Sequence, residues 1–180
     1  MKKLSIILPL AMILCFMVGC QDKEAMAELE AMKAQAEVEE QNLEIVRKLL
    51  AELDKGNADI IKELWTPDVS YYFPSNSPEP MSREESYKFL KMFFDAFPKW
   101  YHKIEELIAV DDKVILRVIE STTHEGEFMG IPATGNKIEF GEILIYRIEN
   151  GKIAEIRAEG DMVSFYQQLG MELKPKEGEK

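Results

Sequence analysis

The fold is constrained most by the periodicity of apolar residues, which changes once along the chain. Apolar residues recur with a helical period before Pro98, and they alternate with polar residues from Trp100 onward. Helices followed by consecutive strands favour an α+β fold over alternating βαβ units. We therefore expect a cone-shaped α+β barrel, in which about three N-terminal helices cover a curved antiparallel sheet.

Each predicted helix has a start or a stop signal. Gly56 suits the left-handed residue after a helix, and Pro98 ends the third helix. Ser82 and Glu85 form the pattern of a capping box. The predicted helices are 42–55, 59–65 and 82–97.

Strands dominate the second half of the chain. Asn150 and Gly151 form a dipeptide that is typical of tight hairpin turns. The loop 130–135 combines glycine and proline as a rigid, sharply turning connection requires. The predicted strands are 69–73, 102–110, 114–124, 137–148 and 153–159.

One carboxylate, Asp161, stands where the last strand ends and a final helix begins. A carboxyl group beside an apolar cavity would have a raised pKa and could move a proton as a general acid/base. Asp is also a preferred N-cap residue, which requires no catalysis. Both interpretations stay open for Asp161.

Two further polar residues, Arg117 and His124, lie on the predicted strand 114–124. Arg117 shares a strand face with Ile115 and Ile119, so it is either an edge residue or a buried cation that steadies an enolate or pairs with Asp161. His124 could donate to a substrate oxygen or act as a structural hydrogen-bonding residue.

Aromatic residues on the predicted elements could line a pocket for a flat hydrophobic ligand, although aromatic residues at these periods are often ordinary core. The candidates for ligand contact are Trp65, Tyr72, Phe97, Trp100 and Phe128.

The cysteine and histidine content excludes several kinds of site. Of the two cysteines, Cys15 lies in an N-terminal apolar run and Cys20 directly follows it, so the folded domain has no thiol for a disulfide or a nucleophile. The two histidines do not have metal-ligand spacing, and we expect no metal and no cofactor. The net charge of −11 argues against binding to nucleic acid.

The N-terminus has the features of a secretory signal. Lys2 and Lys3 precede the apolar run 4–18, which is too short for a stable membrane span. The run ends at Gly19 and Cys20 and resembles the lipobox of bacterial lipoproteins, which implies a lipid anchor on Cys20 in the cell envelope, outside the cytoplasm, at the outer membrane or the cell surface. The predicted segments are a signal at 1–19, a helical, solvated tether at 20–38, a domain at 39–171 and a disordered tail at 172–180.

A heptad pattern crosses the boundary between the tether and the domain. Leu29, Ala36, Leu43 and Leu50 repeat every seven residues. This spacing is typical of a dimerising coiled coil. A solvated tether that continues into the first core helix would give the same pattern without a partner.

Four segments together resemble the SnoaL-like polyketide (ester) cyclases of the nuclear-transport-factor-two-like superfamily. They are THEGEFMGIPATG at 123–135, NGKIAE at 150–155, Asp161, and QLG at 168–170. The resemblance implies the cone fold and cofactor-free intramolecular aldol closure. It also implies that Asp161 removes a proton beside a carbonyl. After Glu155 the family commonly has His-Trp, whereas this chain has Ile156 and Arg157.

Two classes of function follow from these observations. The first is an ester cyclase-type enzyme with acid/base chemistry, an aldol-type cyclisation or isomerisation, on a small carbonyl compound. The second is a lipid-anchored, non-catalytic binding protein for a small hydrophobic ligand. A homodimer through an exposed sheet face is a third expectation.

Overall fold

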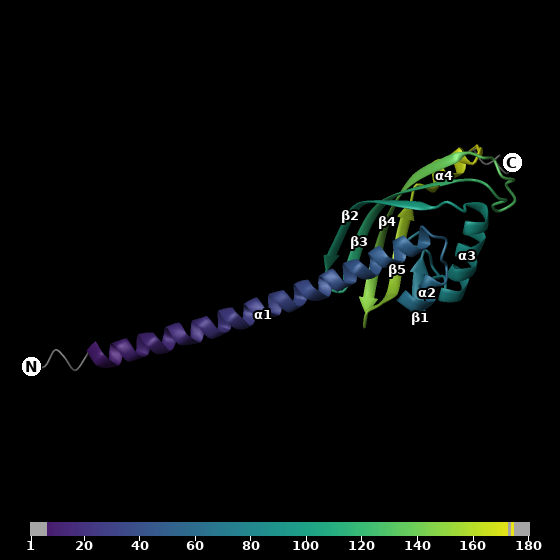
Figure 1. Cartoon of the computed structure of the whole chain (residues 1–180). Helices are drawn as coiled ribbons and strands as arrows, with labels where there is room; N and C mark the ends of the chain where they lie inside the picture. Colours follow the sequence, from purple (N-terminus) through teal and green to yellow (C-terminus); the bar gives the residue numbers. More distant parts are fainter. Residues whose placement is uncertain (1–6, 173, 175–180) are drawn as a thin grey trace, which may run out of the picture. The chain divides into compact units, whose positions relative to one another are not determined.

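The computed structural model describes residues 7–172 and 174, with side chains from residue 23 onward. In chain order the elements are α1 (Ile7–Leu53), α2 (Ile60–Leu64), β1 (Trp65–Tyr72), α3 (Arg83–Ala96), β2 (Tyr101–Val110), β3 (Lys113–Thr123), β4 (Lys137–Glu149), β5 (Lys152–Gly160) and α4 (Met162–Gln168) (Figure 1). The predicted α+β fold is confirmed. Most elements lie close to the predicted ranges, but α1 is one helix that begins at Ile7 and β1 begins at Trp65.

The five strands form one mixed sheet in the order β1-β5-β4-β3-β2. The pairs β2–β3, β3–β4 and β4–β5 are antiparallel, as predicted, but β1 pairs with β5 in parallel. The prediction of a purely antiparallel sheet was therefore wrong. The reason is that β1 does not continue the hairpin series: α3 and three strands separate it from β5 along the chain.

Local signals fix the ends of two elements as expected. Ser82 and Glu85 form the predicted capping box, in which each side chain pairs with the other residue's backbone N–H. The turn between β4 and β5 has positive φ at both Asn150 (50°) and Gly151 (72°), as a tight hairpin turn requires.

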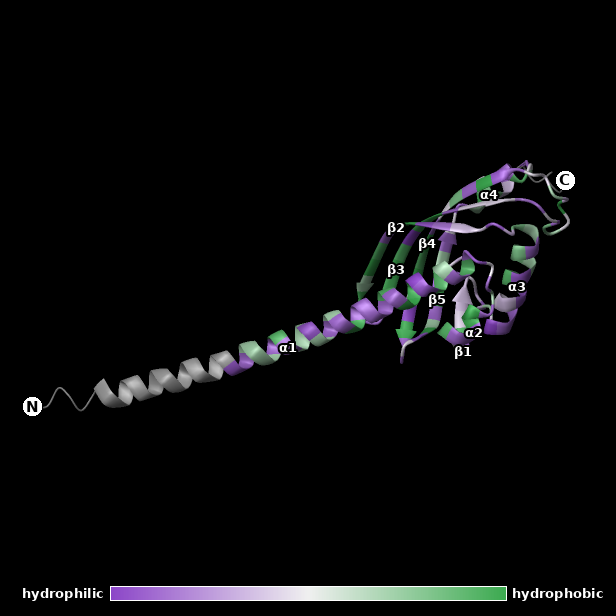
Figure 2. Ribbon diagram, in the orientation of Figure 1, coloured by the Kyte–Doolittle hydropathy of each residue, from purple (hydrophilic) through white to green (hydrophobic). Residues whose placement is uncertain are grey.

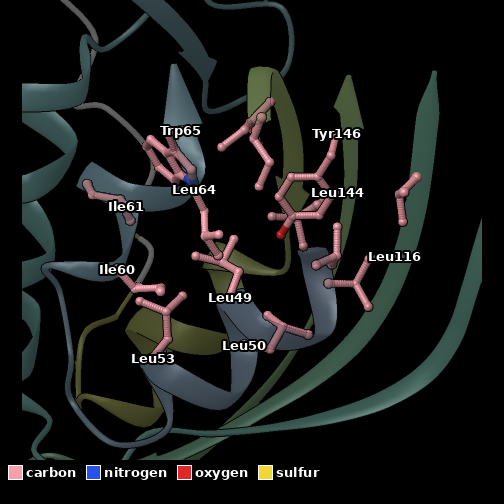
Figure 3. Close-up of a cluster of buried hydrophobic side chains, with 14 of the residues drawn as sticks. Leu49, Leu50, Leu53, Ile60, Ile61, Leu64, Trp65, Leu116, Leu144 and Tyr146 are labelled. Atoms are coloured by element: carbon pink, nitrogen blue, oxygen red, sulfur yellow. The ribbon is translucent and has the colours of Figure 1, made fainter. Parts of the chain in front are cut away.

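The main core lies between the last turns of α1, α2 and the inner face of the sheet. Figure 3 shows leucines of α1 between the isoleucines of α2 and side chains of the strands. Leu49 is 2% exposed, Ile61 and Leu116 are fully buried, and Tyr146 is 2% exposed. A second cluster, rich in phenylalanine, joins α3, the loop after β3 and α4. The helices therefore cover one face of the sheet and leave the other face open.

The outer face of the sheet carries a row of partly exposed apolar side chains. Ile115, Ile143 and Ile145 are 38–49% exposed, and Figure 2 shows hydrophobic stretches on the strands of the sheet. The expected homodimer through this face stays a prediction.

The chain divides into two units, residues 1–38 and 39–180. In the first unit every described side chain from residue 23 to 38 is exposed, Leu29 and Met32 among them. In the second unit Val46 and Leu50 are buried in the domain core. The last two heptads thus serve intramolecular packing, and the coiled coil of the first two stays a prediction.

The predictions for the two ends of the chain fall largely outside the described residues. The backbone around Cys20 is helical, its side chain lies outside the described part, and no described helix is long and apolar enough to cross a membrane. Most of the predicted tail, 172–180, also lies outside the described residues.

Candidate active site

A cavity with two lobes lies between the inner face of the sheet and the covering helices. The small lobe has a volume of about 70 Å³ and reaches toward α1, and the large lobe has about 260 Å³ and reaches toward α4. Both lobes share the walls Tyr71, Phe89, Trp100, Glu120 and Glu142. Two carboxyl groups therefore lie where the lobes meet.

Glu120 and Glu142 reach this point because both occupy inward positions on neighbouring strands. Glu120 of β3 pairs with Phe140, and Glu142 of β4 pairs with Val118, so the two glutamates are diagonal neighbours on one face. Their carboxyl groups are hydrogen-bonded to each other.

Gly160 of β5 lies opposite Glu142 and leaves room for its side chain. A Cβ atom at Gly160 would lie 3.3 Å from Oε1 of Glu142, which is tighter than ordinary contact. The glycine that ends β5 thus allows the glutamate to lie against the strand. A larger residue there would displace the carboxyl group.

Burial makes this carboxyl pair basic. Desolvation raises the pKa of Glu142 to about 7, although the hydrogen bond with Glu120 lowers it. Desolvation and then the charge of Glu142 raise the pKa of Glu120 well above its ordinary value. Two such carboxyl groups in contact share one proton near neutral pH, so the pair presents a base and an acid together.

Glu120 is further held by a polar chain, of which Trp100 and His102 also line the small lobe. The indole N–H of Trp100 donates to Oε2 of Glu120 at 2.9 Å, and Nε2 of His102 lies 3.9 Å from Oε1. On its other side, Nδ1 of His102 contacts Oδ1 of Asp54 at 2.6 Å. The ring of His102 is 2% exposed, so this chain is shielded from solvent up to Asp54.

Two tyrosines add neutral hydroxyl groups to the small lobe. Burial, followed by the nearby carboxyl groups, raises the pKa of both Tyr71 and Tyr146 well above 10. Both therefore stay protonated near neutral pH and can donate a hydrogen bond.

Aromatic and methionine side chains form most of the wall of the large lobe. Of the predicted ligand contacts, Trp100 and Phe128 line this lobe, and Trp65 lines the small lobe. The indole N–H of Trp65 is buried and has no hydrogen-bond partner within the described residues. The remaining wall of the large lobe includes Phe73, Met81, Phe93, Met129, Phe140, Met162, Phe165 and Tyr166.

The other two predicted contacts do not line the cavity, and both predictions are corrected. Phe97 is fully buried in the core, where it stacks on His124 with ring centroids 5.1 Å apart. Tyr72 instead lies under the guanidinium of Arg157, with Cζ 4.1 Å from the ring centroid. Neighbouring residues of a strand face opposite sides, so Tyr71 faces the cavity in place of Tyr72.

Comparisons with known proteins agree with this architecture. The sequence model described as SnoaL-like polyketide cyclase matches residues 44–169. The chain belongs to this family. A search of the curated proteins gave no match.

Several solved structures have the same fold, and the region that matches this chain covers nearly all of each of them. AclR from Streptomyces galilaeus is 24% identical, with a TM-score of 0.68 over 73% of this chain and 97% of that chain. IdmH from Streptomyces antibioticus is 25% identical, with a TM-score of 0.63 over 73% and 99%. A SnoaL-like protein from Jannaschia sp. CCS1 is 23% identical, with a TM-score of 0.66 over 75% and 95%.

Asp161 of this SnoaL-like domain is an exposed N-cap. Its Oδ1 accepts the backbone N–H of Ser164 at 3.0 Å, at the start of α4. The next residue, Met162, lines the large lobe, whereas Asp161 is not part of the wall. The N-cap interpretation is confirmed, and the burial that the acid/base interpretation required is not present.

His124 is buried and has a structural role in the loop that carries the family motif. Its Nδ1 accepts the backbone N–H of Thr134 at 3.3 Å and lies 3.1 Å from the Thr134 hydroxyl. Burial lowers its pKa, which favours the neutral ring. It does not line either lobe, so the expected contact with a substrate oxygen is corrected.

Arg117 lies on the outer face of the sheet. It pairs with Glu106 at 3.3 Å and with Glu105 at 3.7 Å, and its side chain is 39% exposed. It borders a shallow depression with Gly141 and Glu159 on that face. The sheet separates it from the cavity, so the expected role as a partner of an enolate or of Asp161 is corrected.

Sequence analysis missed both glutamates of the pair. Leu116, Val118 and Glu120 follow one another at every second position of β3, which places a carboxylate on a buried face. Extending the alternation from the apolar residues to the charged ones would have identified Glu120.

In the described part of the chain, no three His, Cys, Asp or Glu side chains converge as metal ligands do.

Proposed function

We propose that this SnoaL-like protein performs cofactor-free acid/base chemistry on a small carbonyl compound and that Glu142 and Glu120 move the proton. The observation that carries the proposal is the hydrogen-bonded carboxyl pair at the junction of an aromatic cavity, where the pKa of Glu142 is about 7. A base of this strength is suited to operation near neutral pH.

The pair can supply both partners of an enolisation. The ionised carboxylate of Glu142 removes a proton from the carbon beside the carbonyl, and the electron pair of that C–H bond moves to form the enolate. The proton that Glu120 shares with Glu142, or the hydroxyl of Tyr71, supplies a hydrogen bond to the enolate oxygen. Attack of the enolate on a second carbonyl would give an aldol-type ring, and return of the proton to another carbon would give an isomer.

The glutamate pair takes the place of Asp161 in this proposal. A solvent-exposed N-cap carboxylate lacks the desolvation that makes an acid basic enough for a carbon acid. IdmH, which is 25% identical, is described as a candidate polyketide cyclase. This description supports the reaction class without naming a substrate.

The exchange of carbon-bound hydrogen in D₂O would test the proposal without knowledge of the natural substrate. A panel of small ketones and β-keto esters is incubated with the protein, and loss of the α-proton signal is followed by NMR. We expect catalysed exchange by the wild type, a loss of about 10²–10⁴-fold in Glu142→Gln, and no change in Asp161→Asn. Equal exchange in Glu142→Gln, or a loss confined to Asp161→Asn, would reject the assignment.

The aromatic wall of the large lobe favours a second function, capture of a small hydrophobic ligand without catalysis. Its volume of about 260 Å³ is slightly below the usual range for drug-sized ligands. A binding protein would retain its affinity for a neutral aromatic probe in Glu142→Gln and would lose it when the wall is filled, for example in Phe128→Trp.

We further propose that the protein acts at the cell envelope, anchored by a lipid on Cys20 and facing outside the cytoplasm. Support comes from the sequence alone: two lysines, an apolar run and a Gly-Cys pair at the N-terminus. Such a location favours a small extracellular molecule over an intermediate of cytoplasmic biosynthesis.

A further inference from the structure

The polar chain behind the carboxyl pair extends to the end of α1. Oδ1 of Asp54 accepts the backbone N–H of His102 at 3.1 Å, and it lies 2.6 Å from Nδ1 of the His102 ring. An ionised aspartate at this distance fixes the Nδ1–H tautomer of the ring, so Nε2 is left free to face Glu120. The ring is further held by Trp100, whose centroid lies 4.4 Å away.

Once Glu142 has taken a proton from a substrate, the pair holds two protons and no longer contains a base. Transfer of the Glu120 proton to another group would restore a base, and Nε2 of His102 lies 3.9 Å from Oε1 of Glu120.

We propose that His102, held by Asp54, takes up the proton of Glu120 whenever Glu142 becomes protonated, and returns it when Glu142 is deprotonated. The O–H bond of Glu120 breaks and an N–H bond forms at Nε2, while the Nδ1 proton stays on the ring and Asp54 stays ionised. The result is an imidazolium between two carboxylates. The inference rests on the proposed function, in which His102 is a positioning residue because it acts through Glu120.

Two features of the surroundings favour this transfer. Asp54, directly after α1, and Glu120 from β3 face the two ring nitrogens, and a carboxylate on each side favours a positive ring. Beyond Glu120, the groups that face the cavity are Glu142 and the neutral Tyr71 and Tyr146, so no described cation opposes the imidazolium there. The distance of 3.9 Å must shorten by about 1 Å to reach hydrogen-bonding range.

The substitution Glu142→Gln mimics the protonated glutamate and allows a direct test. The chain has only two histidines, so nitrogen-15 NMR of the rings resolves His102 from His124. In Glu142→Gln at pH 7 we expect both ring nitrogens of His102 to carry protons and Glu120 to be ionised in the carbon-13 spectrum. In the wild type at the same pH we expect a ring with a bare Nε2.

Matched variants separate the relay from a structural hydrogen bond. Adding Asp54→Asn to Glu142→Gln should return the ring to its neutral form, whereas Glu139→Gln, which removes an exposed carboxylate of β4, should leave it as in the wild type. A neutral His102 ring in Glu142→Gln, with the proton still on Glu120, would overturn the inference. That outcome would leave the proposed function intact, because its test is the exchange of carbon-bound hydrogen in the wild type.

Discussion

Glu142 lowers the stability of the fold once it is ionised. Its folded-state pKa of about 7 exceeds the ordinary value of 4.5, so the folded state binds the proton more tightly than the unfolded state. The resulting stability is present below about pH 4.5 and is lost as the pH rises to about 7. At about 1.4 kcal/mol for each pKa unit, the loss is roughly 3 kcal/mol.

We therefore predict that Glu142→Gln is more stable than the wild type at pH 8 by up to roughly 3 kcal/mol and about equal to it at pH 4. Urea unfolding at both pH values measures the difference. Glu139→Gln on the outer face of the same strand is the control. An equal effect of Glu142→Gln at both pH values would contradict the raised pKa.

Asp161 gives a second test at the residue scale. Because its carboxylate caps α4, Asp161→Ala should lower the free energy of unfolding by about 1 kcal/mol, and Asp161→Asn, which keeps a capping oxygen, should cost less. Chemical denaturation measures both. A variant with unchanged stability but no activity would restore the acid/base interpretation of this residue.

Single residues were the hardest part to predict from sequence. Asp161 stood out because it follows a strand and matches a family motif, yet the same features suit a cap. Glu120 and Glu142 were hidden among alternating residues, and their pairing depends on the register between β3 and β4. Register is a long-range property that local patterns do not specify.

At the scale of elements, α1 belongs to two environments. Leu50 is 5% exposed in the domain core, whereas Leu29 is 51% exposed on the first unit. Leu50→Ala should therefore destabilise the domain by about 2–5 kcal/mol, and Leu29→Ala should change its stability by less than about 0.5 kcal/mol. Thermal unfolding measures both at low protein concentration. A large, concentration-dependent effect of Leu29→Ala would instead indicate the coiled coil.

The elements themselves followed well from sequence. The capping box at Ser82 and the turn at Asn150-Gly151 were identified with their geometry, because both signals act within a few residues. The parallel pairing of β1 with β5 was missed, since strand neighbours far apart in sequence are selected by the packing of the whole sheet.

At the scale of the whole molecule, the proposed lipid anchor determines where the protein acts. Removal of residues 1–19 takes away two lysines, so the formal charge changes from 22 − 33 = −11 to 20 − 33 = −13. Such a charge repels an anionic lipid surface, and membrane attachment would then depend on the acyl chains.

We predict that Cys20→Ser moves the protein from the membrane fraction to the soluble fraction and abolishes incorporation of labelled fatty acid. Cys15→Ser is the matched control and should retain both properties. Membrane association of Cys20→Ser equal to that of the wild type would exclude the lipid anchor.

The central claim is that two carboxyl groups in the cavity share a proton near neutral pH. Carbon-13 NMR titration of the glutamate side chains, with Glu142→Gln and Glu120→Gln identifying the signals, tests it most directly. We expect a step near pH 7 that belongs to the pair. In Glu142→Gln we expect a lower midpoint for Glu120, because the charge of Glu142 that raises its pKa is removed. Two independent midpoints near the ordinary value of 4.5 would show that the pair is solvated and ionised, and would contradict the proposed chemistry.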